Sequence, residues 1–171
     1  MARMNTPHTP KTGRHTTDGR PHGRTSLTPH IVVSPANAAI EFYRSVFGAT
    51  VRSVTEMQGL VGHAELDFGL GGLTLSDPMA AYRLAAPAPE ADVTYSMGLY
   101  LPDVDAVVAR AVQAGATLRE PVATFVSGDR YGSLLDPFGV RWTVMTRVED
   151  LSDEESARRV ADWAAAQAGK A

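Results

Sequence analysis

The chain repeats one order of secondary structure twice, and this repetition constrains the fold more than any other feature. The stretch "FGAT" (47–50) returns as "AGAT" (114–117), and "HAEL" (63–66) corresponds to "YGSL" (131–134), at offsets of 67 and 68 positions. Two nearly equal offsets indicate an internal duplication of one unit. Each unit reads as a strand, a helix and three further strands. The sequence therefore predicts an α+β fold built from two βαβββ modules.

In the first half, "LTPHIVV" (27–33) reads as a strand and "ANAAIEFYRSVF" (36–47) as an amphipathic helix. Ser34 is expected to cap this helix, Pro35 suits its first turn, and Gly48 ends it. Three strands are then expected, at about 50–57, 60–68 and 72–76.

The second half follows the same plan. "YSMGLYL" (95–101) reads as a strand, and the next helix is expected to run from a cap at Asp103 to a stop at Gly115. Three further strands are expected near 117–126, 130–135 and 140–146. A terminal helix over 152–169 is predicted by the capping box of Ser152 and Glu155.

Composition separates a basic tail from an acidic body. Residues 1–26 contain five Lys and Arg against one Asp, a net charge of +4. Since the whole chain has a net charge of −3, the remaining residues carry −7. The tail is rich in Thr, Pro and Gly and lacks apolar periodicity, which predicts disorder. The acidic body gives no electrostatic signature of nucleic-acid binding, although the basic tail leaves open a protein that acts through interactions of that tail.

These features divide the chain into three parts. We expect a disordered tail (1–26), a two-module domain (27–148) and a C-terminal helix (149–171). Within the domain, module one covers 27–77, a Pro/Ala-rich linker 78–92, and module two 93–148. The chain has no cysteine, which excludes disulfides and thiolate chemistry. No apolar run is long enough to span a membrane, so a cytoplasmic location without membrane partners is expected.

Period-two alternation assigns one apolar and one polar face to the strands. The apolar face, which includes Trp142, is expected to pack under the helices. The polar face carries hydroxyls, imidazoles and tyrosines rather than the Lys and Glu of a freely solvated sheet. Two such sheets curled into one eight-stranded sheet would make a cup suited to a small organic ligand.

Four stretches resemble the vicinal oxygen chelate superfamily, which includes glyoxalases, extradiol dioxygenases and bleomycin-resistance proteins. They are "PHIVVSPANAAIEFYRSVFGAT", "GHAELDFGLGGLTLSD", "YLPDVDAVVARAVQAGAT" and "GDRYGSLLDPFGVRWTVMTR". The segment "VEDLSDEE" also resembles a glyoxalase-like branch whose members mostly lack an assigned reaction. The resemblance implies paired βαβββ modules that form a cup, often in a homodimer.

In the enzymes of this superfamily, His, Glu or Gln from the first and last strand of each module hold a divalent metal. The resemblance carries these positions over to Thr28, Thr74, Ser96 and Thr143. All four are hydroxyl residues, which bind a divalent cation weakly but can hydrogen-bond a ligand. This departure from the usual metal ligands favours a metal-free binding role, as in the drug-sequestering resistance proteins, over a cofactor-dependent reaction.

Three other polar-face residues leave two enzymatic alternatives open. His30, His63 and Glu65 could form a displaced site for Fe, Mn, Ni or Zn, which would support a lyase, isomerase or dioxygenase. Alternatively, His30 or the pair of His63 and Glu65 could transfer protons without a cofactor. The predicted ligand-binding set is Thr28, His30, His63, Glu65, Thr74, Ser96, Tyr100, Tyr131 and Thr143.

Overall fold

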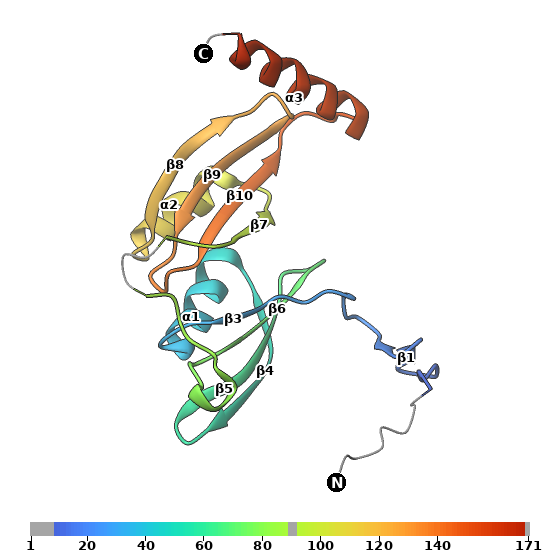
Figure 1. Cartoon of the computed structure of the whole chain (residues 1–171), viewed down its shortest axis with the longest axis vertical. Helices are drawn as coiled ribbons and strands as arrows, with labels where there is room; N and C mark the ends of the chain where they lie inside the picture. Colours follow the sequence, from blue (N-terminus) through green and yellow to red (C-terminus); the bar gives the residue numbers. More distant parts are fainter. Residues whose placement is uncertain (1–8, 89–91, 170–171) are drawn as a thin grey trace.

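The computed structural model describes residues 9–88 and 92–169, and its core is the predicted pair of modules (Figure 1). Module one contains β3 (His30–Val32), α1 (Ala36–Phe47), β4 (Thr50–Met57), β5 (Leu60–Asp67) and β6 (Gly72–Ser76). Module two contains β7 (Ser96–Tyr100), α2 (Val104–Gln113), β8 (Thr117–Thr124), β9 (Asp129–Leu135) and β10 (Arg141–Arg147). The predicted duplication and the α+β class are confirmed.

The two modules have the same sheet topology. The first sheet has the strand order β3-β6-β5-β4 and the second β7-β10-β9-β8. In each sheet the first and last strands of the module pair in parallel and the other neighbours are antiparallel. Each module thus contributes four of the eight predicted strands, and no hydrogen-bonded ladder joins the two sheets among the described residues. The alternation along each strand specifies its faces, but not how two sheets are joined.

An aromatic cluster joins the modules on the apolar side of the sheets. Tyr43 and Phe47 of α1 pack on Trp142 of β10, with ring centroids 5.2 and 4.8 Å apart respectively. Phe42 of the same helix meets Phe138 of module two at 6.0 Å. Trp142 is buried, as its place in the alternation predicts. Burial of these large rings is the main apolar contribution to holding the halves together.

A buried carboxylate completes this junction. Asp136, in the turn between β9 and β10, accepts hydrogen bonds from Tyr43 Oη at 2.7 Å and Trp142 Nε1 at 3.0 Å. It also accepts hydrogen bonds from the backbone N–H groups of Phe138 and Val140. Burial raises the pKa of Asp136, against the opposing effect of these four donors. Burial, together with the neighbouring Asp136 carboxylate, raises the pKa of Tyr43 well above its usual range.

The two modules also hold the N-terminus of their helix in a similar way. Ser34 does not cap α1; instead the N–H of Ala36 donates to Oδ1 of Asp77, at 3.0 Å, just after β6. In module two, Asp103 caps α2 as predicted, and the N–H of Val104 also donates to Thr146 on β10. Thus, in both modules, a side chain near the end of the last strand binds the first turn of the helix, a contact between residues more than 40 positions apart.

The chain ends flank the modules. The composition of residues 1–26 predicts disorder, whereas residues 9–26 carry a small hairpin, β1 (Thr16–Thr17) and β2 (Arg20–Pro21), projecting from the body (Figure 1). Residues 1–8 lie outside the described residues. The predicted terminal helix is α3 (Asp153–Ala168), capped by Ser152, and it lies at the far end of module two.

The linker between the modules holds a short 3-10 turn, η1 (Ala80–Tyr82); its residues 89–91 are not described. None of the helices in the described residues is long and apolar enough to cross a membrane.

Replacing Asp136 by Asn is expected to lower the free energy of unfolding by about 2–3 kcal/mol. The amide presents an N–H₂ group where only donors face it, so at least one of the four donors loses its acceptor. Urea denaturation measures the loss. Asp105→Asn is the matched control, because Asp105 forms an exposed ion pair with Arg130. Removing this exposed pair should lower the free energy of unfolding much less. Equal losses in the two variants would contradict the proposed role of Asp136.

Candidate functional site

The polar face of the first sheet collects most of the predicted site residues. His30 on β3 is the register partner of Thr74 on β6, and Thr74 is also the partner of Glu65 on β5. His63 precedes Glu65 by two residues on β5 and therefore shares its face. Parallel pairing of the first and last strands thus places two imidazoles, a carboxylate and a hydroxyl side by side.

His30 is held by hydroxyl groups. Its Nδ1 lies 2.9 Å from Thr74 Oγ1, and its Nε2 lies 3.3 Å from the Oγ of the buried Ser76. The His30 ring stacks parallel to His63, with centroids 6.1 Å apart. Partial burial, and secondarily the nearby His63, lower the pKa of His30. The lowered pKa favours the neutral ring of His30, which can donate one hydrogen bond and accept another.

Glu65 lies between the imidazole of His63 and the guanidinium of Arg24. Its Oε1 is 3.8 Å from His63 Nε2. Its Oε2 is buried from solvent without a well-aligned hydrogen bond, and the guanidinium of Arg24 forms an ion pair with it. Arg24 belongs to the N-terminal arm, which we define as residues 9–26. A residue of the arm is therefore part of the polar face of module one.

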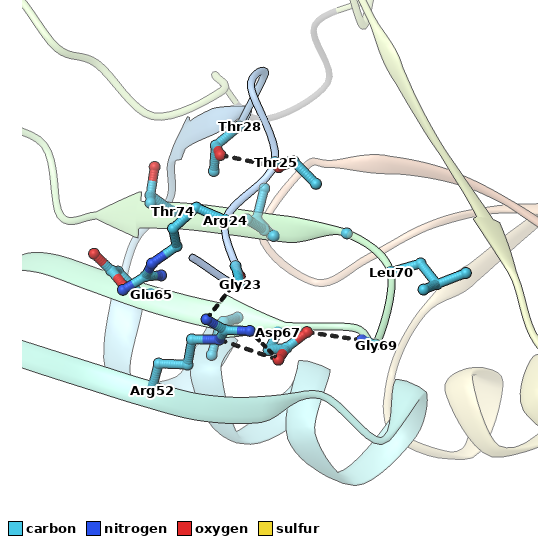
Figure 2. Close-up of a pocket in the computed structure, with 14 residues that line it drawn as sticks. Gly23, Arg24, Thr25, Thr28, Arg52, Glu65, Asp67, Gly69, Leu70 and Thr74 are labelled. Carbon is cyan, nitrogen blue, oxygen red and sulfur yellow. Dashed lines mark hydrogen bonds and ion pairs between the residues drawn. The ribbon is translucent and has the colours of Figure 1, made fainter. Parts of the chain in front are cut away.

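A cavity of about 200 Å³ lies between the arm and the sheet (Figure 2). Residues 23–25 of the arm and Thr28 form one wall. The opposite wall is formed by β5, β6 and the 69–72 turn. Figure 2 shows Arg24 extending over the sheet toward Glu65, with Thr74 beside it. The cavity is thus lined by hydroxyls and charged groups from elements that are distant in sequence.

A second ion pair fixes the base of the arm. Arg52 on β4 donates to Asp67 Oδ2 at 3.0 and 2.5 Å, and to the carbonyl oxygen of Gly23 at 3.1 Å. Hydrogen bonds from Arg52 and from the N–H of Gly69 lower the pKa of Asp67. Asp67 therefore has a structural role in holding the arm and the turn.

The equivalent face of module two carries a different set of groups. Ser96 Oγ and Thr143 Oγ1 are 3.2 Å apart, so these two carried-over positions do meet. Beside them, Arg141 donates to the buried Ser133 at 3.0 Å and forms an ion pair with Glu120. This face is hydroxyl-rich near β7 and β10 and carries the ion pair of Arg141 and Glu120 beside the hydroxyls.

The two tyrosines predicted to bind a ligand lie on module two, away from the cavity beside Arg24. Tyr131 packs edge-on against Phe125, and Phe125 in turn packs against Trp163 of α3. Tyr100 is 55% exposed. A shallow recess between the β8–β9 loop and α3 is lined by Phe125 and Trp163 but not by Tyr100 or Tyr131.

The structure therefore divides the nine predicted ligand-binding residues between two faces. His30, His63, Glu65 and Thr74 lie together, but of these four only Glu65 and Thr74 line the cavity beside Arg24. Thr28 also lines this cavity, where it is 3.3 Å from Thr25. Ser96 and Thr143 form a pair on the other sheet. Within residues 9–88 and 92–169, no three His, Asp or Glu side chains are grouped so as to hold a metal ion, and this includes the alternative set of His30, His63 and Glu65.

Three functional residues were not predicted from the sequence. Arg24 was assigned to a disordered tail because of the composition around it, and Arg52 is one of many exposed strand residues. Ser76 was counted as the end of a strand, although it binds His30. A signal for Ser76 exists in the sequence. It lies two residues after Thr74 on the same strand, so strand alternation places both side chains on the same face.

Comparison with known proteins agrees with this architecture. The sequence model of the Glyoxalase/Bleomycin resistance protein/Dioxygenase superfamily matches residues 23–144. The chain belongs to this superfamily. The match begins inside the arm, one residue before Arg24.

Relatives in this superfamily share the fold over most of their length. An uncharacterized protein of Mycobacterium bovis is 33% identical over 134 residues, 76% of this chain and 88% of the relative. The crystal structure of TioX from Micromonospora superposes with a TM-score of 0.58 at 20% identity, covering 72% of this chain and 98% of TioX. A gene product of Arabidopsis thaliana of known structure gives a TM-score of 0.51 at 26% identity, covering 70% and 97% of the respective chains.

The four positions that the resemblance assigns to a superfamily metal do not suit one. Thr74 is hydrogen-bonded to His30, and Ser96 to Thr143, so their hydroxyls already have partners. None of the four supplies the imidazole or anionic oxygen that tight divalent binding requires.

Acidification is expected to destabilise the protein through His30. In the unfolded chain His30 has its ordinary pKa of 6.5, whereas the folded state lowers it. Below about pH 6.5 the unfolded chain therefore binds this proton more readily, and stability falls as the pH drops toward the folded pKa. Urea midpoints at pH 7.5 and 5.5 should differ less in His30→Gln than in the wild type.

The control for this experiment is His15→Gln, since His15 is an exposed histidine of the arm. It should retain the full wild-type dependence on pH. An undiminished pH dependence in His30→Gln would contradict the lowered pKa of His30.

Proposed function

We propose that this chain binds a small organic molecule on the polar faces of its sheets without a metal, and that it serves in sequestration or detoxification. The role resembles that of the bleomycin-resistance members of the superfamily. The cytoplasmic location predicted from the sequence belongs to this proposal. The first binding surface is the group of His30, His63, Glu65 and Thr74, of which Glu65 and Thr74 line the cavity beside Arg24.

One observation carries the proposal: the superfamily's metal positions are all hydroxyls, and each is already within hydrogen-bonding distance of another hydroxyl or of His30. Thr74 binds His30, and Ser96 binds Thr143. Hydroxyl and imidazole groups can each donate and accept, so the face offers a ligand several hydrogen bonds of either sense. A ligand could therefore be oriented without a cation to anchor it.

The arrangement of the sheets supports a homodimer as the binding form. In one copy, the cavity beside Arg24 is lined by module one and the arm, whereas the recess beside Trp163 is lined by module two and α3. A cup that encloses a ligand on both sides needs a second polar face opposite the first. We propose that a second copy supplies it.

A cofactor-free acid–base reaction is the second candidate, and the stacked histidines favour it. The lowered pKa of His30 favours its neutral form, and His30 lies beside His63, which is 3.8 Å from Glu65. A neutral imidazole next to an imidazole–carboxylate pair is a workable proton acceptor. Turnover that His30→Ala abolishes, with ligand affinity nearly unchanged, would favour this candidate over binding alone.

The metal-free proposal predicts how a ligand binds. Native mass spectrometry should identify a small molecule that co-purifies with the protein, and its dissociation constant should stay within about twofold after dialysis against EDTA. His30→Ala and Thr74→Val should each weaken binding roughly tenfold, since each removes a hydrogen-bonding group worth about 1.4 kcal/mol. Thr117→Val, on the outer strand β8, is the control and should bind as the wild type does.

Metal analysis of the purified protein tests the metal-dependent alternative. Stoichiometric Fe, Mn, Ni or Zn that is lost in His63→Ala or His30→Ala would overturn the metal-free proposal and establish a displaced metal site.

The dimer is tested by the mass of the protein in solution. Light scattering coupled to size exclusion should give about twice the chain mass of 18.2 kDa at micromolar concentration. A mass of 18.2 kDa across this range, with ligand binding intact, would show that one copy suffices.

A further inference from the structure

The N-terminal arm is attached to the body at few points. Between residues 9 and 26, every side chain is exposed except Thr16 and Arg24, which are partly buried. Its contacts with the strands of module one include the ion pair of Arg24 with Glu65 and the hydrogen bond from Arg52 to the carbonyl of Gly23, and Thr25 lies 3.3 Å from Thr28 just before β3. Such a segment has little apolar area to hold it down, so its binding depends largely on these polar contacts.

Arg24 is the cation that pairs with Glu65. With the arm in place, Glu65 Oε2 is buried, and the guanidinium of Arg24 is in contact with it. If the arm lifts away, the carboxylate loses this cation and is left to be hydrated or to pair with another one. The polar face therefore presents an anionic oxygen at the point that Arg24 occupies.

The arm also limits the space over the site. With residues 23–25 in position, the cavity measures about 200 Å³, which is smaller than the roughly 300–1,000 Å³ of ordinary small-molecule pockets. One wall of the cavity is the arm itself. Displacing the arm removes that wall and enlarges the space above Glu65 and Thr74.

From these three observations we infer that Arg24 is a tethered occupant of the binding site, whose guanidinium fills a subsite for cationic groups formed by Glu65. The arm closes the site, and a ligand carrying a guanidinium or ammonium group opens it by replacing Arg24 at the carboxylate. The inference rests on the proposed binding function and adds to it the chemical class of the ligand and a means of regulating access.

The strength of this competition can be bounded. A short flexible tether gives its end group an effective concentration in the millimolar range. An external cation must therefore be present well above its own dissociation constant before it displaces Arg24. Removing the Arg24 side chain should remove this competition while leaving the Glu65 carboxylate and its surroundings intact.

The test is a titration of Arg24→Ala with guanidinium chloride at constant ionic strength, followed by the amide NMR signals of residues 63–74. We expect saturable shifts at millimolar guanidinium in this variant, and at least tenfold higher concentrations for the same shifts in the wild type. The melting temperature of Arg24→Ala should rise by roughly 2–4 °C over the same range. Urea, which is similar in shape but neutral, should have no such effect.

Two control variants separate the subsite from general effects of the salt. Arg14→Ala removes another arginine of the arm, which forms no ion pair among the described residues, and it should respond as the wild type does. Arg24→Ala combined with Glu65→Gln should lose the saturable response, because the carboxylate is gone.

Either of two results would overturn the inference. One is the absence of saturable guanidinium binding in Arg24→Ala. The other is a response of equal strength in the wild type or in the double variant, which would show that Arg24 does not compete or that Glu65 is not the subsite. Since guanidinium itself is the probe, failure here leaves the binding proposal standing. That proposal fails separately, if no co-purified ligand depends on His30 and Thr74.

Discussion

The buried carboxylate of Asp136 is the interaction on which the rest of the structure depends. It accepts hydrogen bonds from a tyrosine of module one and a tryptophan of module two, as well as from two backbone groups of its own turn. The aromatic rings around it supply apolar burial, and the carboxylate fixes how they meet. Because this junction lies on the apolar side of both sheets, their polar faces are left unpaired and available for a ligand or a second copy.

The duplicated scaffold is more uniform than the surfaces it carries. Both modules have the same strand order, and both bind the start of their helix from the end of the last strand. On the polar faces, however, His30 binds Thr74 in module one, whereas Gly98 takes the corresponding place beside Thr143 in module two. Duplication thus supplies two equivalent frameworks, and they carry different sets of polar residues, with two imidazoles on the first face and none among the described residues of the second.

Much of this could be predicted from the sequence, since strand alternation and helical periodicity are local properties. The order of elements, the cap at Asp103, the burial of Trp142 and the common face of His30, His63 and Glu65 all follow from them. Contacts between distant residues do not. The start of α1 is bound by Asp77, 41 positions away from Ala36, and not by the adjacent Ser34 that the sequence suggested. Arg24 was missed because composition describes the arm as a whole, whereas a single ion pair to Glu65 gives one of its residues a place in the site.

The capping contacts of Asp77 and Thr146 also make each module complete in itself. They join the last strand of each module to the helix that follows its first strand, so these hydrogen bonds lie entirely within one module. No backbone pairing between strands crosses from one module to the other among the described residues. A chain divided within the 78–92 linker would therefore yield two halves with intact sheets and helix starts, able to reassociate through the aromatic junction. Such an arrangement is what would be left by the fusion of two copies of a shorter chain that once paired with itself.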